Sequence, residues 1–149
     1  MHFVDVLAVV IIGLMVGNEL TVSLFINPVM RRLDAAAQTL AISLFAGILG
    51  RVMPFWYTLC FVLLLVETLA LRGHPGFSSL LVATLLWAGV IVFTLATLVP
   101  INNRIAALAA NAPLGQWLPS HTRWERLHRV RIALLLTALV LLVHGLMAA

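Results

Sequence analysis

Four long runs of apolar residues, separated by short polar segments, constrain the fold of this chain more than any other feature. They cover about residues 4–26, 54–71, 79–99 and 126–147. A helix needs about 20 apolar residues to cross the roughly 30 Å hydrocarbon core of a bilayer. Only 9% of the residues are charged, whereas a soluble domain has about 25%. The sequence therefore predicts an all-α fold, an integral membrane four-helix bundle in which residues 1–149 form a single transmembrane domain within the lipid bilayer.

Two segments between these runs are assigned by their composition. Residues 35–50 are too polar at their start for a span, so we expect a short amphipathic helix there or a continuing helical segment after the first span. We expect Pro54 to begin the second span, because proline favours the first turn of a helix. Residues 101–125 are expected to form one long polar connection. The first run is too long for a signal peptide and lacks a basic segment before it.

The basic residues are all arginines, and they are distributed very unevenly. Eight lie between the first and second spans, between the third and fourth spans, or at the start of the fourth: Arg31, Arg32, Arg51, Arg104, Arg123, Arg126, Arg129 and Arg131. The opposite side has Arg72 alone. Basic residues mark the cytoplasmic side of a membrane protein. The sequence thus predicts a multi-pass protein of the cell (inner) membrane with both termini outside the cytoplasm, and no nucleic-acid partner.

Polar side chains within apolar spans carry the functional information, because each costs a few kcal/mol there unless it is paired or functional. Glu19 in the first span is such a residue. At 100° per residue, Trp124, His128 and Arg131 share one face of the fourth span. A carboxylate in hydrocarbon is either uncharged or paired with a cation, so we expect Glu19 to meet His128 or Arg131. The structural alternative is an ion pair that fixes helix register.

Other residues of the spans suggest packing contacts. Gly13, Gly17 and Thr21 form a small-residue stripe of the kind that lets helices approach closely. The stripe lies about 160° around the helix from Glu19, so we expect it to face a neighbouring helix or a second protomer in a homo-oligomer. Glu67, near the other end of the bundle, has Arg72 and His144 as potential partners. We interpret that group as structural.

A metal site is a further hypothesis. Glu125 and His128 form one Glu-x-x-His motif, whereas di-iron bundles use two such motifs. A mononuclear metal site remains open, with His121, His128 and Glu19 as its weak candidates.

Three features in order along the chain point to a family. They are Glu19, the run Pro-Ile-Asn-Asn-Arg at residues 100–104, and Trp124-x-x-x-His128-x-x-Arg131. In this order and spacing they resemble the anthrone-oxygenase-like family of small four-helix membrane proteins, most of whose members have no assigned function. The resemblance covers nearly the whole chain. Characterised relatives oxidise a polycyclic aromatic anthrone to an anthraquinone, so the resemblance implies dioxygen as co-substrate and an aromatic small molecule as substrate.

The chemistry of that reaction suggests a role for each candidate residue. Removing the acidic C–H proton of an anthrone gives an electron-rich anion that can pass an electron to dioxygen without a metal. Such a site needs a base, donors for the developing oxyanion and a flat apolar wall. We expect the base to be His128 or Glu19. The other expected residues are the oxyanion donors Asn102, Asn103 and Arg131, and the wall residues Trp124, Trp56 and Tyr57.

The competing hypothesis is a non-enzymatic membrane component, either a structural subunit or a lipid- or small-ligand-binding protein. Four spans with polar residues gathered near one end of the bundle would suit such a protein as well, but it would show no turnover. A carrier ranks below both hypotheses, because carriers usually have internal repeats and polar groups at the bilayer midplane, and this sequence shows neither.

Overall fold

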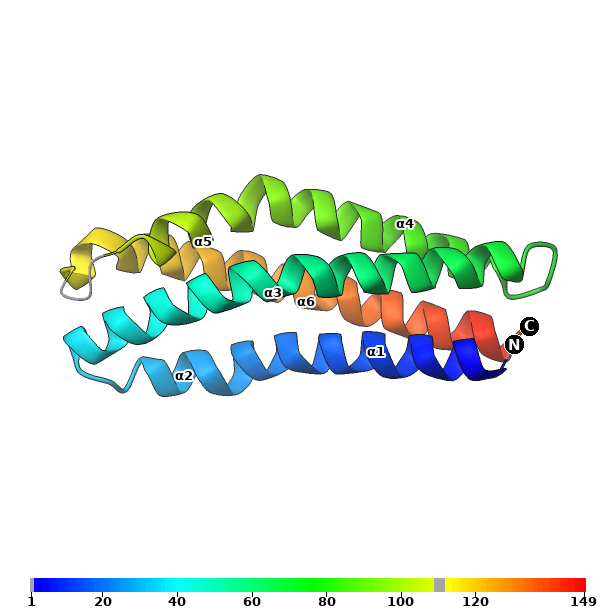
Figure 1. The fold of residues 1–149 in the computed structure, drawn as a ribbon, viewed down its shortest axis with the longest axis horizontal. Coiled ribbons are helices and arrows are strands. Elements are labelled where there is room, and N and C mark those ends of the chain that lie inside the picture. The colour runs from blue at the N-terminus through cyan, green and yellow to red at the C-terminus, as the bar shows by residue number, and fades with distance from the viewer. Residues whose placement is uncertain (1, 109–111) are drawn as a thin grey trace.

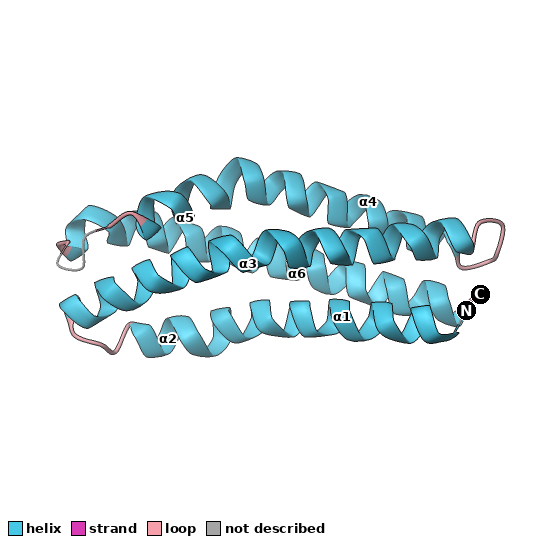
Figure 2. Cartoon of the chain, in the orientation of Figure 1, coloured by secondary structure: helices cyan, strands magenta, loops and turns pink. Residues whose placement is uncertain are grey.

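The computed structural model describes residues 2–108 and 112–149, and these ranges contain helices and no strand. Four long helical rods pack side by side as an elongated bundle (Figures 1 and 2). In chain order, the rods are α1 (His2–Thr21) with the π-helical segment η1 (Val22–Ile26) and α2 (Asn27–Met30); α3 (Ala35–Ala70); α4 (Phe77–Phe93) with the π-helical segment η2 (Thr94–Leu98) and α5 (Val99–Ala106); and α6 (Leu114–Met147). All four rods are long and apolar enough to cross a membrane, which confirms the predicted fold class.

The rods run alternately in opposite directions, and both termini lie at the same end of the bundle (Figure 1). The turn at 71–76 also lies at that end, while the turn at 31–34 and the connection after α5 lie at the other. Most arginines therefore gather at the end away from the termini. The chain is a multi-pass membrane protein whose charge is concentrated at one end.

The second rod differs from the sequence prediction at Pro54. The predicted segment 35–50 and the predicted span from 54 form one unbroken helix, α3, with Pro54 inside it. Proline is tolerated within membrane helices when neighbouring groups satisfy the freed backbone. Packing holds the helix together, because Ile42 and Ala46 on one side of the proline and Tyr57 on the other are buried against the rest of the bundle. Of the two alternatives for 35–50, the structure supports the continuing helix.

The predicted connection at 101–125 is wrong, since most of it is helical. Ile101 and Ile105 of α5 are buried one turn apart, while the intervening Asn103 and Arg104 are exposed. The fourth rod begins at Leu114 rather than near 126. Its early turns were missed because the buried positions hold tryptophan, histidine and glutamate rather than aliphatic residues.

Helix ends and close backbone contacts fix the packing of the rods. Asp34 begins α3 by accepting hydrogen bonds from the backbone N–H groups of Ala36 and Ala37, at 3.1 and 3.0 Å. At the other end of the bundle, Gly76 lies directly against Gly145 of α6. A Cβ atom on Gly76 would lie 1.9 Å from the Gly145 carbonyl oxygen, so only glycine allows this contact.

Two apolar clusters form the core, and a polar layer separates them. The larger cluster fills the end that holds the termini and is built around Ile12, Leu64 and Trp87. The smaller one fills the arginine-rich end and includes Met30 and Trp117. The buried polar residues between the clusters include the predicted site.

The two π-helical segments share one sequence arrangement. In each, five residues are followed by one residue and then by proline, which is Pro28 after η1 and Pro100 after η2. A proline removes one backbone N–H and its ring clashes with the carbonyl four residues earlier. Widening the preceding turn to a π-helix is one way to accommodate it, and such turns are frequent at functional sites. Both segments contribute residues to the central cavity described below.

Candidate functional site

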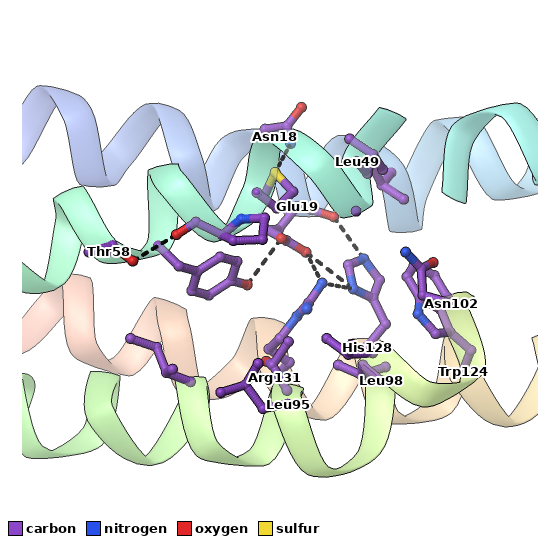
Figure 3. A pocket seen from close by; sticks show the side chains of 18 residues that line it. Asn18, Glu19, Leu49, Thr58, Leu95, Leu98, Asn102, Trp124, His128 and Arg131 are labelled. Atoms are coloured by element: carbon purple, nitrogen blue, oxygen red, sulfur yellow. Dashed lines mark hydrogen bonds and ion pairs between the residues drawn. The ribbon is translucent and has the colours of Figure 1, made fainter. Parts of the chain in front are cut away.

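Three rods bring four polar side chains together at the centre of the bundle: Glu19 from α1, Tyr57 from α3, and His128 and Arg131 from α6. Figure 3 shows Glu19, His128 and Arg131 pointing toward one another. All four are buried. Arg131 Nη2 donates to Glu19 Oε2 at 2.6 Å, and the Tyr57 hydroxyl donates to Glu19 Oε1 at 3.0 Å. The Arg131 guanidinium also lies over the Tyr57 ring, 5.4 Å from its centroid. The expected meeting of Glu19 with His128 and Arg131 is confirmed.

The hydrogen bonds of His128 determine which ring nitrogen carries its proton. Arg131 Nη2 lies 2.9 Å from His128 Nδ1, and a guanidinium can only donate. We therefore assign Nδ1 as the acceptor, which makes His128 neutral, although Nδ1 also lies 3.2 Å from Glu19 Oε2. The other nitrogen, Nε2, lies 3.2 Å from the Glu19 backbone carbonyl and donates to it. Both nitrogens are thus occupied by the protein itself, and the Glu19–Arg131 pair carries no net charge.

The buried face of α6 continues from His128 as a column of flat side chains. The ring of Trp124 stacks on His128 with centroids 4.6 Å apart, and His121 stacks on the other face of Trp124 at 5.8 Å. Trp117 meets His121 edge-on at 5.8 Å. The column follows from the spacing of these residues by three or four along the helix. It holds the His128 ring in one orientation.

A cavity of about 220 Å³ lies beside the four polar side chains. Side chains from all four rods form its wall. Most of them are apolar, including Val22, Met53, Ile91 and Leu98 from the first three rods. Glu19, Tyr57, His128 and Arg131 line it, as do Trp124 and Asn102. An apolar cavity of about 150 Å³ is enough to take up benzene. The cavity can therefore hold a molecule larger than a single ring.

Two buried polar atoms that belong to lining residues have no partner among the described residues: Arg131 Nε and Thr94 Oγ1. Arg131 is only 7% exposed, and a buried donor without a partner costs about 1–3 kcal/mol. Both atoms are themselves buried within the wall of the cavity. They belong to the polar part of a lining that is otherwise mostly apolar.

The structure separates the predicted site residues into two groups. Glu19, His128, Arg131, Tyr57, Trp124 and Asn102 line the cavity. Asn102 also donates to the Ala46 carbonyl at 3.0 Å. Trp56 instead donates to the Ile11 carbonyl at 3.3 Å, and Asn103 is exposed on α5. Neither lines the cavity, because each points to a different face of its helix from its neighbour Tyr57 or Asn102.

The candidate metal ligands do not converge. His128 Nδ1 lies 3.2 Å from Glu19 Oε2, but His121 lies on the far side of the Trp124 ring. Within residues 2–108 and 112–149, no three His, Cys, Asp or Glu side chains are placed to hold one ion. Glu125 instead pairs with Arg31 and has His121 Nδ1 3.8 Å away. This second ion cluster ties the end of α2 to α6.

For residues outside the cavity, the structure can be compared with the predicted contacts. No hydrogen bond or ion pair joins Glu67 to Arg72 or His144 among the described residues, and His144 bonds Ser79 instead at 3.0 Å. Gly17 and Thr21 are exposed on the outside of this single chain, which leaves the predicted homo-oligomer contact as a prediction. Arg123, Arg126 and Arg129 are exposed, on other faces of α6 than the buried Arg131.

Thr94 and Met53 are site residues that sequence reasoning did not identify. Threonine is common in apolar helices, where its hydroxyl usually bonds the carbonyl of the preceding turn, so Thr94 gave no signal. Met53 receives a 3.8 Å contact from the Asn18 amide across α1 and α3. Pro100 follows η2 closely in the sequence, and it points to an irregular turn in the part of the cavity wall that contains Thr94.

Comparison with known proteins adds the family. A model of the anthrone oxygenase family matches residues 42–141. No curated protein and no solved structure matches the chain. The matched region includes five of the six predicted site residues that line the cavity, and the whole of η2. The chain therefore belongs to the anthrone oxygenase family.

Proposed function

We propose that the chain is a membrane-embedded oxygenase that oxidises a polycyclic aromatic or quinol-like substrate with dioxygen in the central cavity. Family membership supports the reaction class. The mostly apolar wall with a few converging polar groups supports a small-molecule site. The single observation that carries the proposal is a mostly apolar cavity that is lined by the buried, ion-paired side chains of Glu19 and Arg131.

The proposed reaction converts a ring CH₂ group and O₂ into a ring C=O group and water. The substrate first loses a proton from its CH₂ carbon, and the charge moves to the oxygen of the opposite ring carbon. One electron then passes from this anion to dioxygen, which gives a substrate radical and superoxide. These two radicals combine at the former CH₂ carbon to form a peroxide. The proton returns to the outer peroxide oxygen. Loss of water, with the second hydrogen of the carbon, leaves the ketone.

The geometry favours Glu19 over His128 as the base. Both nitrogens of His128 are engaged within the protein. Each carboxylate oxygen of Glu19 accepts one bond and keeps a further lone pair. We assign Glu19 as the proton acceptor and Arg131 as a donor to the oxyanion. His128 acts as a positioning residue that holds the pair.

Asn102 and Thr94 complete the proposed site. The Asn102 amide donates one hydrogen to Ala46 and has a second available to the cavity. Thr94 also lines the cavity, and its hydroxyl has no partner among the described residues. Trp124 and Tyr57 add aromatic side chains to the lining. Preorganised donors aimed at a developing oxyanion are often the largest source of rate enhancement.

The test compares adjacent asparagines in dioxygen-uptake assays with anthrone and purified protein in lipid vesicles. Loss of an oxyanion donor slows turnover by roughly 10²-fold or more, so we expect that loss for Asn102→Ala. Asn103→Ala is the matched control, since Asn103 is exposed and outside the cavity. The rate with empty vesicles is subtracted, because anthrones oxidise spontaneously.

A non-enzymatic membrane component is the alternative function. It predicts that wild-type protein takes up no dioxygen above the empty-vesicle rate. It also predicts that Asn102→Ala changes only stability, which thermal unfolding of the same samples measures. That pair of results would replace the oxygenase proposal with a ligand-binding or structural role.

A further inference from the structure

The wall of the central cavity includes side chains that are also exposed on the outer surface of the bundle. Pro54 and Thr58 of α3 and Leu95 of η2 line the cavity and are exposed. Leu95 is 60% exposed. A residue can do both only where the wall is thin or open. These three residues place an opening of the cavity between α3 and η2.

The course of the third rod explains why the wall opens there. On one side of the opening, α3 packs against α4, where Trp87 Nε1 donates to the Tyr57 carbonyl at 3.1 Å. On the other side, α3 packs against α5, where Asn102 bonds Ala46. Between these contacts the third rod bows away from α3 (Figure 1). The bow coincides with η2, the π-helical turn that precedes Pro100.

The arginines of the second rod indicate how deep in the bilayer the opening lies. Arg51 and Arg72 are both exposed, and 21 residues separate them, which is about 31 Å along a helix. This distance matches the hydrocarbon core of a bilayer. Thr58 lies seven residues inside Arg51, at a depth of about 10 Å. The opening therefore faces acyl chains rather than water.

The side chains at the rim of the opening offer no free hydrogen-bond donor. The Thr58 hydroxyl donates to the Pro54 carbonyl at 2.8 Å, so it offers no free donor to a passing molecule. Leu95 presents a hydrocarbon side chain on the other edge. Uncharged, lipid-soluble molecules would cross such a rim without losing hydrogen bonds.

Toward the arginine-rich end, the cavity narrows to a second one of only about 30 Å³. The two cavities share Val22, Leu49, Asn102 and Trp124. Trp124 covers that side and stacks between His121 and His128. Beyond it lies the smaller apolar cluster with Trp117 and Met30, and then the ion pair of Arg31 with Glu125. A molecule arriving from water at this end would have to displace packed aromatic rings and a salt bridge.

We infer that the cavity is loaded sideways from the hydrocarbon layer, through the opening between α3 and η2. Its substrate is then a flat, uncharged molecule dissolved in the bilayer. An oxygen substituent on that molecule would meet the polar side chains of the lining, which include Glu19, Arg131 and Asn102. The inference rests on the proposed function only for what happens to the substrate once it is bound.

The experiment uses a probe that cannot reach the cavity through water. The protein is placed in phosphatidylcholine vesicles that contain a phosphatidylcholine with a diazirine in the middle of one acyl chain. After illumination, mass spectrometry locates the labelled residues. Leu98 is the reporter, because it lines the cavity and is only 1% exposed. We expect labelling of Leu98 in the wild-type protein.

Two variants narrow the opening, and a third is the control. Thr58→Trp and Leu95→Trp place an indole on either edge, and we expect each to reduce Leu98 labelling several-fold. Leu85→Trp is matched to Leu95→Trp, since Leu85 is 62% exposed on α4 and does not line the cavity. Leu85→Trp should label Leu98 as the wild type does. Thermal unfolding of each variant shows that it is folded.

The outcomes separate this inference from the proposed function. An unlabelled Leu98 in wild-type protein, beside a labelled Leu85, would overturn the lateral entrance. Equal Leu98 labelling in all three variants would overturn it as well. Neither result depends on turnover. A protein that labels as expected but takes up no dioxygen would keep the entrance and lose the oxygenase assignment.

Discussion

At the scale of single residues, one buried ion pair organises the site. Glu19 and Arg131 neutralise each other, and Tyr57 and His128 bond the two partners. Removing one partner of a buried pair is strongly destabilising because the other charge is left uncompensated. Apolar replacement of a whole pair can be nearly neutral. The pair should therefore be coupled in both stability and function.

A double-mutant cycle measures this coupling. We expect Glu19→Gln and Arg131→Met each to lower the free energy of unfolding by about 3–5 kcal/mol. The double variant should lose less than the sum of the two, by about 2 kcal/mol. Denaturant unfolding in detergent micelles provides the measurement, with Arg126→Met as an exposed-arginine control. Strictly additive losses would show that the two side chains do not interact.

Sequence reasoning identified the members of this cluster through the cost of polar groups in hydrocarbon. Glu19 had to find a cation, and helical spacing put His128 and Arg131 on one face of their span. The tautomer of His128 could not be predicted, because it depends on a backbone carbonyl of another helix. Trp56 and Asn103 were chosen by proximity in sequence, and a difference of one residue turns a side chain by about 100°.

At the scale of elements, the π-helical segments shape the cavity. The η2 segment supplies Thr94, Leu95 and Leu98 to its wall. Its turn is widened ahead of Pro100, which lacks the backbone N–H needed for a regular helix. Without this widening, the third rod would run straight past α3. The proline thus acts on the site through the backbone.

We expect Pro100→Ala to narrow the cavity. Alanine restores the missing N–H and removes the ring clash, so η2 can tighten into a regular helix. Binding of anthraquinone in vesicles, followed by quenching of tryptophan fluorescence, should weaken about tenfold, or about 1.4 kcal/mol. Pro119→Ala is the control, because Pro119 lies inside α6 and does not line the cavity. Unchanged affinity in Pro100→Ala would contradict this role for η2.

Elements were predicted best where the buried stripe is aliphatic. The four spans followed from hydrophobic length alone. The start of α6 was missed because Trp117, His121 and Glu125 are buried there. The join within α3 was missed because Pro54 looks like a helix start, while packing at both sides keeps the helix continuous. Tertiary contacts decided both cases.

At the scale of the whole molecule, the charge asymmetry predicts the orientation. Both termini lie at one end of the bundle, opposite the turn that contains Arg31 and Arg32 (Figure 1). The arginine-rich end should face the cytoplasm. The cavity would then open into the half of the hydrocarbon layer nearer the cytoplasm.

Alkaline phosphatase fusions test the orientation, since this enzyme is active only after export. A fusion after Ala149 should be active. A fusion in the turn at 31–34 should be inactive, and it serves as the internal comparison. The reverse pattern would invert the bundle and place the cavity opening in the outer half of the bilayer.

The most direct test of the whole account follows the oxygen atom. Vesicles with wild-type protein are supplied with anthrone and ¹⁸O₂, and the appearance of ¹⁸O-labelled anthraquinone is timed by mass spectrometry. We predict one ¹⁸O per product molecule and a rate far above that of empty vesicles. Glu19→Gln, which removes the proposed base, should fall to the empty-vesicle rate. Equal rates in wild-type, Glu19→Gln and empty vesicles would contradict the assignment of this cavity as an oxygenase site.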